Sequence, residues 1–103
     1  MPSETIHFTS ARQLSRLYAD DERNLEEAEH IVGVSIASRD DWVTVEGKIE
    51  PIARLKAVFE LLEAARAQGL RIRSSDFHYT LRCVAEGKAD ELREIYRHPL
   101  VIK

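Results

Sequence analysis

The stretch LYADDERNLEEAEHIVGVSI, Leu17 to Ile36, decides the fold of this 103-residue chain. One helix runs into the polar segment Ala-Asp-Asp-Glu, a second helix follows with Leu25 on its apolar face, and Gly33 precedes an alternating VSI. Apolar residues three or four apart are typical of an amphipathic helix, and alternation is typical of a half-buried strand. The stretch therefore predicts helix, turn, helix and strand, with Gly33 ending the second helix in the left-handed conformation.

The residues before this stretch predict one strand and the start of the first helix. TIHFTS, residues 5–10, alternates apolar and polar side chains as a half-buried strand does. Ser10 is a suitable N-cap, with Gln13 three residues later where a capping box has Glu or Gln. Leu14, Leu17 and Tyr18 then form the apolar stripe of a helix over residues 11–18.

The residues after this stretch predict a hairpin and three more helices. VSIAS (34–38) and WVTVEG (42–47) alternate, and the short polar connection between them favours an antiparallel hairpin. A helix of about 18 residues ends at Gly69, another runs from near Ser75 to Gly87, and a last one covers residues 89–96, after which HPLVIK is extended. Two inward positions stay open, Ile31 or Val32 in the second helix and Cys83 or Val84 in the penultimate one.

The order is β-α-α-β-β-α followed by two short helices. It predicts an α+β, two-layer domain in which a three-stranded antiparallel sheet carries helices on one face. The length fits one domain over residues 1–103, with a core at about 5–68 and a helical extension at about 70–98.

Composition and charge narrow the classes of function. No apolar run approaches the roughly 20 residues of a membrane span, the first ten residues lack the pattern of a signal peptide, and the single Cys83 cannot form an internal disulfide. We therefore expect a cytoplasmic protein without a membrane partner. The net charge is −3, with 5 basic and 11 acidic residues in 1–50 against 10 basic and 7 acidic in 51–103. Any RNA contact must then come from a local basic patch.

The element order is that of a type I KH module. Short sequence motifs along the chain match one protein family more closely. NL at 24–25, GVSI at 33–36, VTVEG at 43–47 and AEG at 85–87 follow one another at the family's spacing. Over about residues 5–102 the chain resembles the N-terminal domain of the phosphate-starvation-inducible PhoH family. The resemblance implies a KH-like fold and a cytoplasmic bacterial P-loop ATPase implicated in RNA metabolism.

The catalytic machinery of that family is absent from the sequence. There is no G-x-x-x-x-G-K-[ST] motif. Lys48 and Lys88 each follow a glycine, but neither has the earlier glycine of the motif before it or a Ser or Thr after it. We therefore expect no ATP hydrolysis and no cofactor in this chain. It is either the N-terminal domain of a PhoH-like protein, whose ATP-binding domain lies elsewhere, or a stand-alone relative.

Two groups of residues are candidates for binding nucleic acid. Alignment on Leu25 places Ala19-Asp20-Asp21-Glu22 at the KH loop, where glycines normally let phosphates approach the backbone. Three carboxylates oppose that use, and a solvated turn that caps the second helix is the preferred interpretation. The candidates near this turn are Arg12, Arg16, Arg23 and Asn24. The candidates around RAQGLRIR are Arg66, Arg71 and Arg73, with Arg82 nearby; the alternatives are a solvated turn or a contact with an adjoining domain or a subunit.

Other kinds of site receive little support. The acidic pairs and the four histidines lack the spacing of calcium or zinc ligands, and Cys83 and His78 are not one helical turn apart. Two hypotheses remain. The first is an accessory domain that positions single-stranded RNA or a protein partner for an ATPase module; the second is a protein-interaction or oligomerisation module that has lost nucleic-acid binding.

Overall fold

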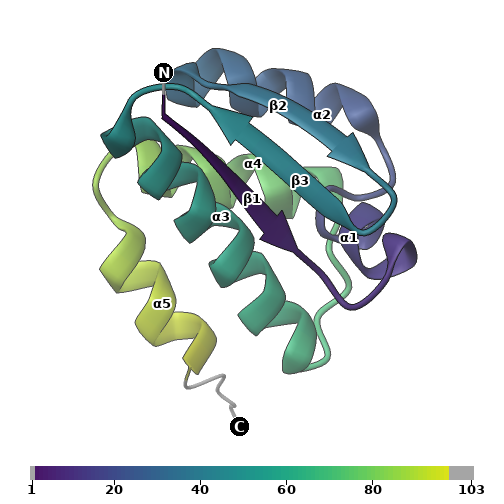
Figure 1. Cartoon of the computed structure of the whole chain (residues 1–103). Helices are drawn as coiled ribbons and strands as arrows, with labels where there is room; N and C mark the ends of the chain where they lie inside the picture. The colour runs from purple at the N-terminus through teal and green to yellow at the C-terminus, as the bar shows by residue number, and fades with distance from the viewer. Residues whose placement is uncertain (1, 98–103) are drawn as a thin grey trace, which may run out of the picture.

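The computed structural model describes residues 2–97, and the side chains of residues 2–94. It is an α+β domain whose elements follow the predicted order (Figure 1). The elements are β1 (Ser3–His7), α1 (Ala11–Leu17), α2 (Glu22–Ala28), the π-helical turn η1 (Glu29–Gly33), β2 (Ser35–Arg39), β3 (Trp42–Glu46), α3 (Ile49–Ala67), α4 (Ser74–Ala85) and α5 (Ala89–Arg97). The predicted extended segment HPLVIK lies outside the described residues.

The three strands form one antiparallel sheet in the order β1-β3-β2. Ile6 of β1 lies opposite Val43 of β3, and Ile36 of β2 lies opposite Val45. β2 and β3 form the predicted hairpin, joined by Asp40 and Asp41. Asp40 adopts φ of 46° without being a glycine, a conformation that Asp tolerates better than most residues.

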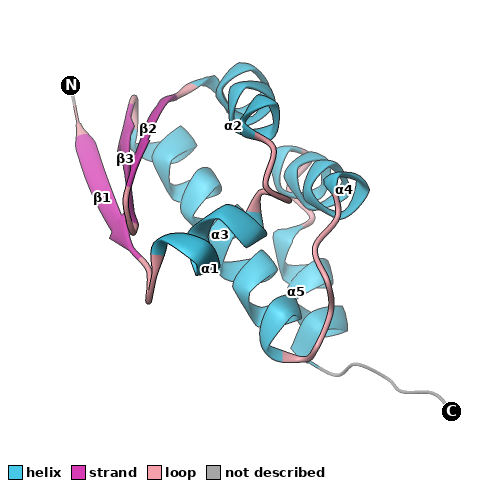
Figure 2. Ribbon diagram, turned by 90° about the vertical axis from the view of Figure 1, so that its right-hand side faces the viewer, coloured by secondary structure: helices cyan, strands magenta, loops and turns pink. Residues whose placement is uncertain are grey.

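The helices lie on one face of the sheet, as predicted (Figure 2). Val43 and Val45 are fully buried against them, whereas Trp42 and Thr44 point to the opposite face. α4 and α5 lie farther from the sheet and pack on α3. They add a second layer of helices, which the predicted two-layer arrangement did not include, and α3 therefore has neighbours on both sides.

The core confirms the predicted apolar stripes and resolves the two open positions. Val32 is 8 % exposed while Ile31 is 39 % exposed, and Val84 is buried while Cys83 is half-buried. The largest fully buried apolar side chains come from α1, α3, α4 and β3. They are Leu14, Leu17, Val43, Val45, Leu55, Val58, Phe59, Leu61, Leu62, Phe77 and Leu81.

Most element boundaries differ from the prediction by one residue, and the first strand and the end of the second helix differ by more. β1 begins at Ser3, two residues earlier than expected, because Ser3 pairs with Glu46 of β3. The second helix ends in η1, where the Val34 amide reaches back five residues to the Glu29 carbonyl at 3.3 Å. This wider turn directs Val32 into the core before Gly33, at φ of 86°, sends the chain into β2.

Candidate nucleic-acid interface

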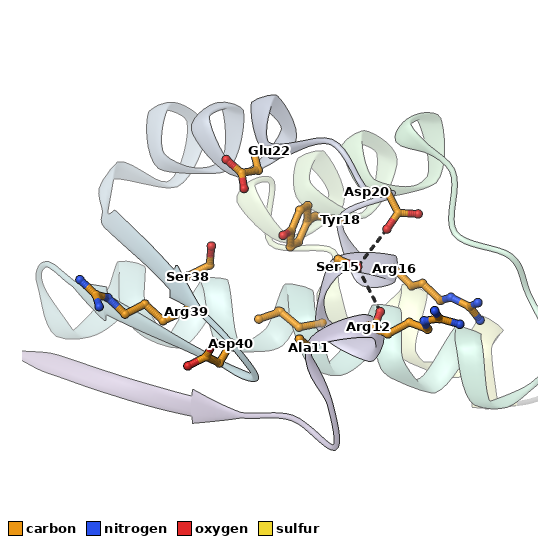
Figure 3. Close-up of a pocket in the computed structure, with 11 residues that line it drawn as sticks. Ala11, Arg12, Ser15, Arg16, Tyr18, Asp20, Glu22, Ser38, Arg39 and Asp40 are labelled. Carbon is orange, nitrogen blue, oxygen red and sulfur yellow. Dashed lines mark hydrogen bonds between the residues drawn. The ribbon is translucent and has the colours of Figure 1, made fainter.

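A cleft of about 650 Å³ lies between α1 and the β2–β3 hairpin, beside the turn that joins α1 to α2. In Figure 3, Arg39 lies on one side of it and Arg12 and Arg16 lie on the other. Its lining residues come from α1, the turn and the end of β2. The polar and charged ones are Arg12, Ser15, Arg16, Tyr18, Asp20, Glu22, Ser38, Arg39 and Asp40. The cleft is therefore polar and contains arginines and carboxylates in equal number.

The turn between α1 and α2 is a Schellman motif built without glycine. The Asp20 amide donates to the Ser15 carbonyl at 2.8 Å and the Ala19 amide to the Arg16 carbonyl at 3.1 Å. Ala19 and Asp20 consequently adopt φ of 61° and 57°, which costs about 1–2 kcal/mol for a residue with a Cβ. The backbone geometry that a glycine normally supplies at such a turn is therefore present here with other side chains.

Two of the three carboxylates of this turn have local structural roles. Asp20 accepts a hydrogen bond from the Ser15 hydroxyl at 2.9 Å. Asp21 caps α2 by accepting from the Arg23 amide at 3.0 Å. The preferred interpretation of the turn, a cap on the second helix, is thus confirmed for Asp21, and Glu22 is left exposed in the first turn of α2.

Tyr18 joins the two walls of the cleft. Its side chain is only 8 % exposed and forms a hydrogen bond with the side chain of Ser38 on β2. Burial raises the pKa of Tyr18 above its ordinary value of 10.0, and the nearby carboxylates of Glu22 and Asp20 raise it further. Tyr18 therefore stays protonated at neutral pH and holds α1 to the edge strand.

The outer edge of β2 contributes backbone groups to the cleft. The Ile36 amide points away from β3, since it donates to the Glu29 carboxylate at 2.7 Å. Because alternate residues of a strand point their amides the same way, the amide and carbonyl of Ser38 also face outward, where the cleft lies. Within residues 2–97 no further strand pairs with this edge, so a ligand in the cleft would meet the outward amide and carbonyl of Ser38.

The predicted arginines fall into two sets according to their partners. Arg23 lies against Asp21 through two hydrogen bonds of 3.1 and 2.9 Å, which raises the pKa of Arg23 and lowers that of Asp21. Arg66 forms a similar pair with Glu63 at 2.9 and 2.7 Å. Within the described residues, Arg12, Arg16 and Arg71 are exposed and none of them forms an ion pair.

A second pocket brings the two predicted basic groups together. It has a volume of about 490 Å³, and Arg16, Arg66 and Arg71 line it together with Asp20. Arg16 and Asp20 also line the first cleft, so the two hollows adjoin along one surface. This convergence joins residues about fifty positions apart in sequence.

Arg73 and Arg82 do not line either hollow. The Arg73 backbone amide donates to the Asp76 carboxylate at 2.9 Å at the start of α4, and Arg82 lies on that helix. Sequence reasoning also missed Arg39, Tyr18 and Ser38 as cleft residues. The only signal for Arg39 in the sequence is its position immediately before the hairpin turn, where a side chain can face the neighbouring cleft.

Asn24 is buried rather than presented to a ligand. It is 3 % exposed, and its amide nitrogen donates to the Tyr18 carbonyl at 2.9 Å and to the Ser74 hydroxyl at 3.1 Å. Its side-chain oxygen lies 2.9 Å from Nε2 of His78, which is thereby the donor. Asn24 therefore holds the α1–α2 turn to α4, and its polar atoms are used inside the fold.

The remaining aromatic and titratable side chains form no further candidate site within the described residues. Trp42 lies on the uncovered face of the sheet, half-buried beside His7 with ring centroids 6.3 Å apart. Over the described part of the chain, no three His, Cys, Asp or Glu side chains gather as a metal site. In the same part, no helix is both long and apolar enough to cross a membrane.

Comparison of the chain with known protein families, with curated proteins and with solved structures finds no match.

Proposed function

We propose that this chain is a KH-like accessory domain of a PhoH-like ATPase and that it positions a short stretch of single-stranded RNA in the cleft between α1 and the β2–β3 hairpin. The observation that carries the proposal is that Arg12 and Arg16 of α1 line the cleft beside the outer edge of β2, while Arg71 lines the adjoining pocket with Arg16. Guanidinium groups bind phosphates, and the strand edge offers a donor and an acceptor to a base. No catalysis is assigned to this chain.

The chemistry of the turn defines how the RNA would be held. In a KH module a glycine-containing loop clamps the RNA backbone. Here Ala19 and Asp20 have the left-handed backbone, but the Asp20 carboxylate faces the space that a phosphate would take. We therefore assign the phosphate contacts to the arginines on either side of Asp20 and not to the turn itself.

Salt dependence measures the number of those contacts. If Arg12, Arg16 and Arg71 each neutralise one phosphate, the logarithm of affinity falls with the logarithm of salt concentration with a slope of about −2. Raising the salt from about 50 to 200 mM then weakens binding about twentyfold. Fluorescence anisotropy with a labelled eight-nucleotide uridine RNA gives both numbers.

Arg16→Ala separates the cleft from a general charge effect. We expect it to weaken binding and to reduce the slope by about 0.7. Arg54→Ala removes the same charge from an exposed position on α3 outside both hollows, so it should leave the slope unchanged. Equal effects of the two substitutions, or no binding at 50 mM salt, would contradict the RNA proposal.

The balance of charge in the cleft favours a second candidate function, a protein-interaction module. Asp20, Glu22 and Asp40 line the cleft together with Arg12, Arg16 and Arg39, so a partner that carries both charges would also fit. A folded chain that binds no RNA but assembles or captures its ATPase in light scattering favours this candidate. The accessory role itself predicts a P-loop motif encoded beyond the codon for Lys103, which the gene sequence tests directly.

A further inference from the structure

Within the described residues 2–97, the outer edge of β1 pairs with no other strand, and it lies on the opposite side of the sheet from the cleft. Figure 1 shows β1 at the edge of the sheet, running beside α3. The Phe8 amide donates to the Asp41 carbonyl at 2.8 Å, and the Pro2 carbonyl accepts from the Gly47 amide at 3.2 Å. Even-numbered residues of β1 therefore bond to β3, and the amides and carbonyls of Ser3, Thr5 and His7 face outward.

An apolar groove lies directly under this edge. It has a volume of about 630 Å³ between β1 and α3. Ile6 and Phe8 line it from the strand and Phe59 and Ala64 from the helix, and the rings of Phe8 and Phe59 meet edge to face with centroids 5.6 Å apart. Side chains of an added strand could therefore enter an apolar space while its backbone paired with β1.

We propose that β1 and this groove bind an extended segment of another protein, which adds to the sheet as a fourth strand. Only an extended backbone can satisfy a row of alternating strand donors and acceptors. The site is separate from the cleft, so the proposal does not rest on RNA binding.

The register of β1 defines the side chains of that segment. In the antiparallel orientation, its residues opposite Phe8, Ile6 and Glu4 lie two apart and point to the helical side of the sheet. The first two meet the apolar groove. The third meets Glu4, which faces the helices and accepts from Lys56 at 2.7 Å. The predicted pattern is apolar-x-apolar-x-basic.

The charges along the groove support a basic third position. Three carboxylates lie along or beside the groove, those of Glu4, Glu60 and Glu63. Two cationic side chains lie near them: Lys56, which binds Glu4, and Arg66, which binds Glu63. The excess negative charge also opposes a nucleic-acid backbone. It therefore favours a peptide with a lysine or arginine at that end.

The same register argues against a second copy of this chain as the occupant. Pairing two β1 strands about Ile6 would place Glu4 of one copy opposite Phe8 of the other. That carboxylate would then lie at the apolar end of the groove, near Glu63. Like charge and lost apolar contact both oppose such a dimer.

Peptide binding to the 103-residue chain tests the proposal. The probe is a fluorescein-labelled nonapeptide in which valine, isoleucine and lysine alternate with threonine, flanked by serine. A peptide of the same composition with the valine and isoleucine adjacent serves as the control. We expect the alternating peptide to bind more tightly and to slow amide hydrogen exchange at Thr5 and His7. Replacing its lysine with glutamate should weaken binding about two- to fivefold.

Thr5→Pro is the decisive variant. It removes an outward amide that the β1–β3 ladder does not use, and proline is tolerated at such edge positions. We expect at least about a tenfold loss of peptide affinity, with Thr5→Val unchanged. Ala64→Arg, which fills the groove from α3, should cause a similar loss and provides a second test if Thr5→Pro does not fold.

Several results would overturn the proposal. They are the absence of peptide binding at about 1 mM, full affinity in folded Thr5→Pro and Ala64→Arg, or protection at the β2 edge instead of β1. A dimer in light scattering that Thr5→Pro dissociates would assign this edge to a second copy and overturn it as well.

Discussion

Replacing Asn24 with alanine tests whether this residue is structural or binds a ligand. The side chain is 3 % exposed and links three parts of the chain. It contacts the Tyr18 carbonyl and the Ser74 hydroxyl through its nitrogen and His78 through its oxygen, at 2.9, 3.1 and 2.9 Å. Alanine removes all of these contacts at once and leaves their partners near an apolar methyl group.

The expected cost follows from the number of contacts. Each hydrogen bond contributes about 1 kcal/mol net, so three amount to about 3 kcal/mol of the free energy of unfolding. This is a large part of the 5–15 kcal/mol that is typical of a domain. At about 4–8 °C for each kcal/mol, the melting temperature should fall by roughly 12–24 °C.

Urea denaturation followed by circular dichroism measures the change. Glu26→Ala, on the exposed side of the same helix, is the control and should change the free energy of unfolding by less than about 0.5 kcal/mol. A double-mutant cycle with His78→Ala should give a coupling energy of about 0.5–3 kcal/mol, because the two side chains are in direct contact.

The reasoning is refuted if Asn24→Ala costs less than about 1 kcal/mol and the cycle shows no coupling. A loss of RNA affinity in that stable variant would restore the sequence-based hypothesis that Asn24 binds nucleic acid. Loss of stability together with coupling to His78 assigns it to the fold.

Three further predictions concern Tyr18 and the turn that joins α1 to α2. Ala19→Gly should stabilise the chain by about 1 kcal/mol in urea denaturation, because Ala19 is at φ of 61°, whereas Ala53→Gly within α3 should destabilise it by about 1 kcal/mol. Hydrogen bonds from Arg23 lower the pKa of Asp21 below its ordinary 3.8. The stability that they contribute is therefore present above pH 3.8 and is lost as pH falls through the lower pKa of the folded state. The free energy of unfolding of Asp21→Asn should consequently depend less on pH in that range than that of the unmodified chain. Burial raises the pKa of Tyr18 above 10.0, so folded stability should fall as pH rises past 10, and a denaturation series should show this decline to be smaller in Tyr18→Phe.

The sequence by itself determined the elements and their order. Ser10 caps α1 by accepting from the Gln13 amide at 3.1 Å, and the predicted hairpin forms between β2 and β3. These features depend on side chains a few residues apart, which local patterns record. The second hydrogen bond of the predicted capping box differs: the Gln13 side chain accepts from the Thr9 amide at 2.6 Å and not from the Ser10 amide.

Only the tertiary structure decided which residues meet. Arg16 and Arg71 line one pocket, Asn24 is buried against α4, and the outer edge of β1 lies over an apolar groove. No periodicity encodes such neighbours, because they depend on how helices and strands distant in sequence pack. The left-handed backbone of Ala19 was equally hidden, since its cost is offset by the packing of Leu17, Tyr18 and the start of α2 around the turn. Local spacing therefore specified the elements, and packing between distant elements specified the surfaces that can bind.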